Sequence, residues 1–246
     1  MKLLVCISKT PETTAKIAFT DNNTSFDTNG VTMMMNPYDE WYALVRALEL
    51  KEAHGGSVTI INVGTANNDT IIRKGLAIGA DDAVRIDAEP TSALFTAKQI
   101  AAYAKDKAFD LIFAGKETID YNGSEVAPML AELLDMPCIS YASKLEMEGD
   151  TAVVSREIEG GTEVAEVSTP CVISAAKGLA EQRIPNMRGI MMAKRKPLEV
   201  VPPIEADEPV RIAAYALPPE KGAVKMIDPD QIDQLVTLLH EEAKVI

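Results

Sequence analysis

DLIFAGKETIDYNGSEVAPMLAELL, residues 110–134, joins an apolar run to a small polar turn that opens directly onto an amphipathic segment. The apolar run predicts a buried strand, and apolar residues at helical spacing after the turn predict a helix. A helix start leaves backbone N–H groups unpaired and bears a partial positive charge, so a phosphate can bind there without a basic side chain. The stretch therefore predicts an anion site, although an ordinary strand-to-helix connection capped by Ser124 is the alternative.

The same alternation extends over the first 135 residues or so. Short β-rich runs alternate with stretches of helical period, as in an open, mostly parallel sheet with helices on both faces. We predict strands at residues 3–7, 57–63, 83–86 and 111–114, and helices at residues 70–78 and 92–107. A further helix contains Trp41, Leu44, Val45 and Leu48, with Asn36 as its cap, Pro37 at its first position and Asp39 in its first turn. The fold class is α/β.

After Pro137 the pattern changes to strands without helices between them. We predict strands at residues 144–148, 151–157, 163–167 and 171–175, with hairpin turns at Gly149-Asp150 and Gly160-Gly161, as an antiparallel extension of the sheet. Residues 197–225 are rich in proline and predict an extended arm, followed by a helix capped by Asp228 with Pro229 at its first position. We divide the chain into a nucleotide-binding α/β domain, residues 1–196, and a C-terminal arm and helix, residues 197–246. The apolar side chains of that last helix, which we expect to dock on a partner subunit, are Ile232, Leu235, Val236 and Leu239.

Composition excludes several classes of function. The formal charge of -13 repels nucleic acid and anionic lipid, so neither is an expected partner. No apolar run approaches the roughly 20 residues of a membrane span, so we expect no membrane insertion. Cys6, Cys138 and Cys171 lie in apolar runs without a CxxC pair, which predicts buried thiols in a reducing compartment. Since the chain enters its first strand without a signal or transit segment, we expect a cytoplasmic, bacterial protein.

The residues required for several catalytic chemistries are missing. His54 and His240 both lie at polar helix ends, away from a candidate nucleophile, and there is no HExxH motif. We therefore predict no catalytic residues and no metal site. GxGxxG does not follow the first strand, and GxxxxGK[ST] is absent, which argues against a standard dinucleotide oxidoreductase or an NTPase.

Several loops are expected to meet at one edge of the sheet. Ligands of open parallel sheets bind beyond the carboxyl ends of the strands. Cys6, Val63-Gly64 and Gly115-Lys116 each end a predicted strand, and residues 35–39 open a helix nearby. This convergence predicts a pocket for one adenine and one phosphate.

The segment LAEQRIPNMRGIMMAKRK, residues 179–196, mixes apolar and basic residues and allows two interpretations. One is a core helix that starts near Pro185-Asn186 and buries its methionines. The other is an exposed recognition loop with an apolar anchor and a basic rim, suited to an acidic protein surface.

Five colinear stretches resemble the β subunit of electron-transferring flavoproteins (ETF): MNPYDEWYALVRALELKE (35–52), LAIGADDA (76–83), FAGKETIDYNGSEVAPMLAELLDMP (113–137), REIEGG (156–161) with Pro170, and LAEQRIPNMRGIMMAKRKPLEV (179–200). The resemblance implies an adenine-nucleotide-hydrolase-like fold and a heterodimer with an ETF α subunit that holds most of the FAD. Such a heterodimer carries electrons from acyl-CoA dehydrogenases or other flavin dehydrogenases to ETF-quinone oxidoreductase in the membrane. The β subunit is then not an enzyme, since the redox chemistry belongs to the flavin.

The resemblance also implies a nucleotide in this subunit. It is a structural AMP in ordinary members, which we favour, and a second FAD that oxidises NADH in bifurcating members. A stand-alone nucleotide-binding module of the universal-stress type is a more distant alternative. The implied contacts are Cys6, Asn36, Pro37, Tyr38, Asp39, Val63, Gly115, Lys116, Glu117, Thr118, Ile119, Asp120, Asn122, Gly123, Ser124, Glu125 and Val126.

Three residues of the loop depart from the family pattern: Tyr121, Glu125 and Ala127. A carboxylate at position 125 would repel a phosphate unless it points away, so we assign the phosphate to the backbone amides of residues 123–126.

Two further sites follow from the resemblance. The family's partner-recognition loop aligns with residues 180–193, where Met187 is the apolar anchor, flanked by Arg183 and Arg188 and followed by Ile190. Methionine adapts to pockets of different shape, which suits a carrier with several partners. In the loop of residues 8–14, Thr13 is the side chain expected nearest the flavin.

Overall fold

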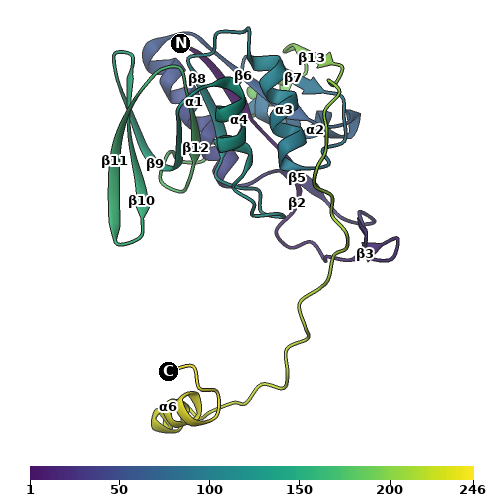
Figure 1. Ribbon diagram of the computed structural model, residues 1–246, viewed down its shortest axis with the longest axis vertical. Helices are drawn as coiled ribbons and strands as arrows, with labels where there is room; N and C mark the ends of the chain where they lie inside the picture. The colour runs from purple at the N-terminus through teal and green to yellow at the C-terminus, as the bar shows by residue number, and fades with distance from the viewer.

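The computed structural model describes residues 1–246, and its centre is one sheet of nine strands (Figure 1). The strands are β1 (Lys2–Cys6), β6 (Ser57–Val63), β7 (Asp82–Ile86), β8 (Leu111–Gly115), β9 (Cys138–Glu148), β10 (Thr151–Ile158), β11 (Gly161–Ser168), β12 (Cys171–Ala175) and β13 (Leu198–Val201). Their order is β11-β10-β9-β12-β8-β1-β6-β7-β13. Along this order, the seven strands β9-β12-β8-β1-β6-β7-β13 run parallel to one another. Within this sheet only the pairs β9-β10 and β10-β11 are antiparallel. The prediction of a mostly parallel sheet with an antiparallel extension is confirmed.

Helices cover both faces of the sheet, as predicted. Leu3 and Val5 of β1 face a core shared with α1 (Asp39–His54) and α2 (Asp69–Ile78). Leu4 and Cys6 face the opposite core, shared with α3 (Ala93–Ala104) and α4 (Val126–Leu134). Side chains of a strand alternate between faces, so a strand in the middle of such a sheet must be apolar on both.

The order of the strands creates a switch point. From β1 the chain adds β6 and β7 on one side, and then crosses to the other side of β1 to form β8. The connections that follow β1 and β8 therefore leave the sheet in opposite directions and open a crevice at the carboxyl ends of these strands.

Strand β12 corrects the prediction for residues 171–175. It lies between β8 and β9 and is parallel to both, and it is not part of the antiparallel extension. All five of its side chains are buried, which is the pattern of a central strand covered on both faces. The extension consists of β9, β10 and β11, and β10 and β11 project from the body in Figure 1.

The predicted caps of the helix that follows residue 38 and of the last helix are both wrong. Helix α1 begins at Asp39, because Tyr38 adopts a positive φ of 65° and separates Asn36 and Pro37 from the helix. Helix α6 (Ile232–Glu241) follows Gln231, while Asp228 accepts a hydrogen bond from the backbone N–H of Asp230 in the preceding turn.

The C-terminal region begins inside the sheet and ends outside it. Strand β13 pairs with β7, so the first residues of the predicted arm belong to the sheet edge. Beyond it, Gln99 of α3 exchanges two hydrogen bonds with the backbone of Ile204, each of 2.8 Å. The chain then runs away from the body to α6, which stands clear of it in Figure 1 and buries no residue. The division at residue 196 and the docking of α6 stay predictions.

The three cysteines are free thiols, and Cys6 and Cys171 are buried as predicted, whereas Cys138 is half-buried. No helix combines the length and the apolar composition that are needed to cross a membrane.

Candidate functional site

The start of α1 lies against the end of β8. A Cβ atom on Gly115 would lie 2.8 Å from Cγ of Glu40 and 3.1 Å from its backbone nitrogen, so only glycine fits there. This close approach brings the residues before α1 next to the loop that follows β8.

Asn36 fastens these two segments together. Its side chain is fully buried; Nδ2 donates to the carbonyl of Glu117 at 3.0 Å, and Oδ1 accepts from the N–H of Ile119 at 3.1 Å. A buried amide that is satisfied on both sides fixes the loop more firmly than apolar contact alone. Asn36 is therefore not the helix cap that the sequence predicted, but it lies in the predicted site.

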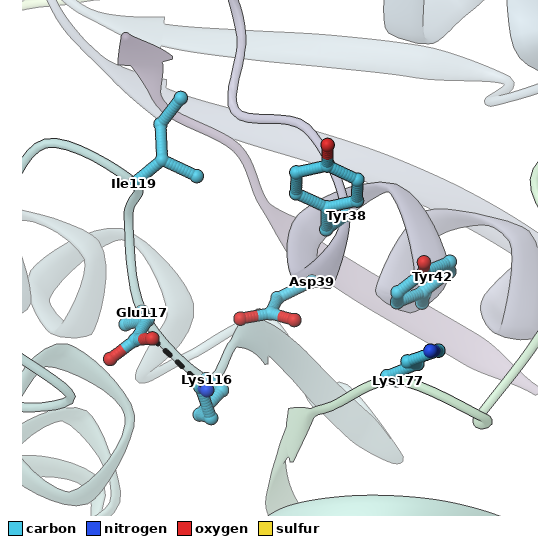
Figure 2. Close-up of a pocket in the computed structure, with 7 residues that line it drawn as sticks. All are labelled: Tyr38, Asp39, Tyr42, Lys116, Glu117, Ile119 and Lys177. Carbon is cyan, nitrogen blue, oxygen red and sulfur yellow. Dashed lines mark ion pairs between the residues drawn. The ribbon is translucent and has the colours of Figure 1, made fainter. Parts of the chain in front are cut away.

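A cavity of about 230 Å³ opens beside this contact (Figure 2). Five of its lining residues were predicted, and Tyr42 and Lys177 were missed. Lys177 follows β12, so it was overlooked because β12 was assigned to the antiparallel extension. The lining residues are Tyr38, Asp39, Tyr42, Lys116, Glu117, Ile119 and Lys177.

The charges around the cavity nearly balance. Lys116 forms an ion pair with Glu117 at 3.0 Å, and this hydrogen bond lowers the pKa of Glu117. Burial raises the pKa of Asp39, against the opposing effect of nearby Lys116. Figure 2 shows Asp39, Lys116 and Lys177 around the same hollow. A cavity with two carboxylates and two ammonium groups attracts an anion weakly, so the phosphate site must be sought elsewhere in the loop.

The loop before α4 presents unpaired backbone donors. None of the N–H groups of Gly123, Ser124 and Glu125 donates a hydrogen bond within the protein. Ser124 is left-handed, with φ 53°, and Glu125, the residue before α4, is right-handed helical; this alternation points successive N–H groups toward a common concavity that suits an anion. Helix α4 has no side-chain cap hydrogen bond and follows Glu125, so the cap that the alternative assigned to Ser124 is wrong.

Glu125 stays beside this concavity. Its carboxylate Oε2 lies 3.8 Å from the position that a Cβ atom on Gly123 would occupy, so the side chain leans over the loop. The loop is also tied to the sheet, because Ser124 Oγ donates to Glu117 at 3.3 Å and accepts from the Tyr141 hydroxyl at 3.3 Å.

Cys6 and Val63 lie at the same edge of the sheet but inside the protein. They end β1 and β6, and both side chains belong to the core beneath α3 and α4. They do not line the cavity.

The loop after β1 is anchored by a residue that the sequence prediction missed. Glu40 is buried, and its carboxylate accepts from the backbone N–H and the hydroxyl of Ser8, both at 2.6 Å. Burial raises the pKa of Glu40 to about 8. The available clue was an acidic residue directly before the apolar face of α1. Beyond Ser8, β2 (Lys9–Pro11) pairs with β5 (Met33–Met35), and Thr13 is exposed just after β2.

Residues 179–196 combine parts of both interpretations. A helix, α5 (Met187–Ala193), begins after Asn186, whose side chain accepts from the N–H of Gly189 at 2.8 Å. Its methionines are exposed, so the interpretation as a core helix with buried methionines is wrong on that point. Arg188 and Ile190 are exposed as well, whereas Arg183 pairs with Glu52 through bonds of 2.6 Å and 2.9 Å.

The chain is similar to known proteins along most of its length. A model of the electron transfer flavoprotein domain matches residues 24–206. The chain is 39% identical to the electron transfer flavoprotein subunit beta of Bacillus subtilis (strain 168) and 32% identical to that of Bradyrhizobium diazoefficiens, with all of each chain covered. It is also 32% identical to the acryloyl-CoA reductase electron transfer subunit gamma of Anaerotignum propionicum, over 98% of this chain and 99% of that one. The chain thus belongs to the electron transfer flavoprotein family as a β subunit, an electron carrier that is not an enzyme by itself, and this membership implies an α-subunit partner and a flavin.

Proposed function

We propose that this β subunit holds AMP at the crevice between β1 and β8 and shares one FAD with its α subunit. The observation that supports this most strongly is the run of unpaired N–H groups at Gly123, Ser124 and Glu125, on a loop that Asn36 fixes at the switch point of the sheet. The donors fit a phosphate, and the adjacent cavity leaves room for the rest of a nucleotide. The FAD supplies the redox chemistry, while this chain positions the AMP and the partner surfaces.

Counting the nucleotides released from the denatured heterodimer tests this proposal. We expect one FAD and one AMP for each heterodimer. Two FAD and no AMP would overturn it in favour of a bifurcating protein, in which a second FAD in this pocket oxidises NADH. Glu125→Gln refines the test: removal of the charge beside Gly123 should slow the loss of AMP on dialysis, because a phosphate and a carboxylate repel each other.

We further propose that the heterodimer works in the cytoplasm and carries electrons from acyl-CoA dehydrogenases or similar flavin dehydrogenases to a membrane ETF-quinone oxidoreductase. The name of the relative from Anaerotignum propionicum joins an electron transfer subunit to a reductase of an acyl-CoA, which supports a partner that acts on acyl-CoA compounds. The donor would dock on α5, where the apolar Met187 and Ile190 are exposed beside Arg188. Arg183, bound to Glu52, would hold the base of this surface in place.

The effect of Met187→Ala tests the docking surface. Loss of a central apolar anchor costs about 1–2 kcal/mol of binding, so reduction of the heterodimer by a subsaturating dehydrogenase should slow about tenfold, with unchanged FAD content. Stopped-flow absorbance of the flavin measures the rate. Met129→Ala, at a half-buried site on α4, is the matched control, and it should not slow reduction. Equal rates for Met187→Ala and the wild type would exclude α5 as the docking surface.

A further inference from the structure

Three methionines are exposed together on one short helix. On α5, 75% of Met187, 68% of Met191 and 49% of Met192 is exposed, whereas Met35 in β5 is fully buried. Met187 and Met191 are one helical turn apart, so their thioethers lie on the same side of α5. Sulfur at such positions is open to peroxide in solution, and sulfur in the core is not.

The opposite side of α5 is clamped to the body. A Cβ atom on Gly189 would lie 2.5 Å from the carbonyl oxygen of Ala77 in α2, so the two helices meet at a glycine. Arg73 of α2 donates to the carbonyls of Ala193 and Lys196 at 2.8 Å and 2.6 Å. These contacts involve no methionine sulfur. Chemical change at the exposed thioethers therefore leaves the helix in place.

We propose that Met187, together with Met191 and Met192, is an oxidation site whose sulfoxides weaken the docking of electron donors. The inference rests on the proposed role of α5 as the docking surface. Hydrogen peroxide is the oxidant, and the two-electron reduction of dissolved oxygen by reduced flavin is one source of it. The thioether sulfur attacks one peroxide oxygen, an S–O bond forms as the O–O bond breaks, and water leaves; sulfur loses two electrons and peroxide gains them.

The physical basis is the change in polarity. A thioether fits an apolar pocket and adapts to its shape, but a sulfoxide brings a strong dipole and a hydrogen-bond acceptor. Burying that acceptor in an apolar pocket without a donor costs free energy. Because methionine sulfoxide reductases restore the thioether, the change is reversible. The strength of docking then follows the peroxide level.

Graded treatment of the intact heterodimer with hydrogen peroxide tests the proposal. Peptide mass spectrometry should show the gain of one oxygen atom at Met187 and Met191 first and at Met35 last. The rate of flavin reduction by a subsaturating dehydrogenase should fall about tenfold in step with sulfoxide at Met187, and methionine sulfoxide reductase should restore it. FAD content, measured on the same samples, should stay constant.

A variant that lacks the sulfur atoms supplies the control. Met187→Leu, Met191→Leu and Met192→Leu together keep an apolar side chain of similar volume at each site. For each protein, the rate of flavin reduction after peroxide treatment is divided by the rate before treatment. This ratio should fall in the wild type and stay near one in the variant. Equal losses in both proteins, or complete oxidation of Met187 without any loss, would overturn the proposal. The Met187→Ala measurement remains separate: slow reduction there with no effect of oxidation would refute the switch and leave the docking surface standing.

Discussion

Helices α1 and α6 are both amphipathic, yet they are in opposite situations. Helix α1 covers the sheet, and half of its residues, including Leu44, are buried. Helix α6 has an apolar stripe that includes Leu235 and Val236, but it buries nothing. An amphipathic helix is stable when its stripe is covered, so α1 completes the body of this subunit and α6 lacks its cover. The α/β body is therefore covered by its own helices, and the docking of α6 on the α subunit is the prediction that would supply the missing cover.

The largest expected effect is a loss of stability when a leucine of α1 is shortened, which the same change in α6 should not cause. Leu44→Ala removes a fully buried side chain and should lower the free energy of unfolding of the separate β subunit by about 3 kcal/mol. Leu235→Ala should change it by less than about 0.5 kcal/mol, since that side chain is exposed and α6 has no buried residue. In the heterodimer we expect Leu235→Ala to weaken association at least about tenfold.

Urea unfolding of the separate subunit and sedimentation of the mixed subunits measure these quantities. Gln234→Ala, on the polar side of α6, is the control and should affect neither. If Leu235→Ala destabilised the separate subunit as much as Leu44→Ala does, α6 would be folded against its own body and the comparison would fail.

The second effect concerns how the body holds its candidate site. Asn36→Ala should lower the free energy of unfolding by about 2 kcal/mol, because it leaves the partly buried carbonyl of Glu117 and N–H of Ile119 without these partners. Hydrogen exchange over residues 117–125 should accelerate with it. Asn29→Ala, at an exposed turn, should cost less than about 0.5 kcal/mol in the same urea titration. Unaltered exchange in the loop would mean that Asn36 does not hold it.

The sequence predicted the fold best where a repeating pattern determines it. Residues 57–63 form a strand with the predicted bounds, because a run of β-branched residues between turns has few alternatives. The assignment failed for β12, since a short apolar strand looks the same in parallel and antiparallel surroundings. The cap of α1 failed because the backbone at Tyr38 has a positive φ, which is uncommon for a residue other than glycine and which local rules do not foresee.

The residues of the candidate site also divide into those that the sequence pattern determines and those that it does not. Asn36 and residues 115–119 were placed together because the ends of parallel strands meet at one edge. Lys177 depended on the position of β12, and Glu40 depended on burial that no periodic pattern predicts. The exposure of Met187 was also undetermined, since apolar composition alone fits both a core helix and a surface helix.

The third effect is a dependence of the stability of the α/β body on pH. Burial raises the pKa of Glu40 to about 8, well above the value near 4.5 of an exposed glutamate, and the charges of Asp120 and Asp39 act in the same direction. The folded state then keeps a proton that the unfolded state has lost, so stability falls as the pH rises from about 4.5 toward 8. Between pH 6 and pH 7 this loss should be about 1 kcal/mol, with a limit of about 1.4 kcal/mol.

Glu40→Gln keeps the shape and cannot ionise, so its free energy of unfolding should be flatter over this range than that of the wild type. The exposed Glu132→Gln of α4 serves as the control and should keep the wild-type slope. Parallel curves for the wild type and Glu40→Gln would show that Glu40 ionises in the folded state as it does in the unfolded state.

The smallest effect tests where the body ends and the arm begins. The Tyr121 hydroxyl lies 2.9 Å from the hydroxyl of Tyr215, which stacks on Phe19 of the short strand β3 (Phe19–Thr20) with ring centroids 4.9 Å apart. Tyr121→Phe removes only the hydrogen bond, so hydrogen exchange of the arm near Tyr215 should accelerate by less than about fivefold, equivalent to at most about 1 kcal/mol. Tyr103→Phe is the control, because that hydroxyl has no such partner in the arm. A much larger acceleration would mean that one hydroxyl pair holds the arm to the body. No change would mean that the stack on Phe19 and the hydrogen bond of 2.7 Å from the Tyr215 N–H to the carbonyl of Asn23 hold the arm without it.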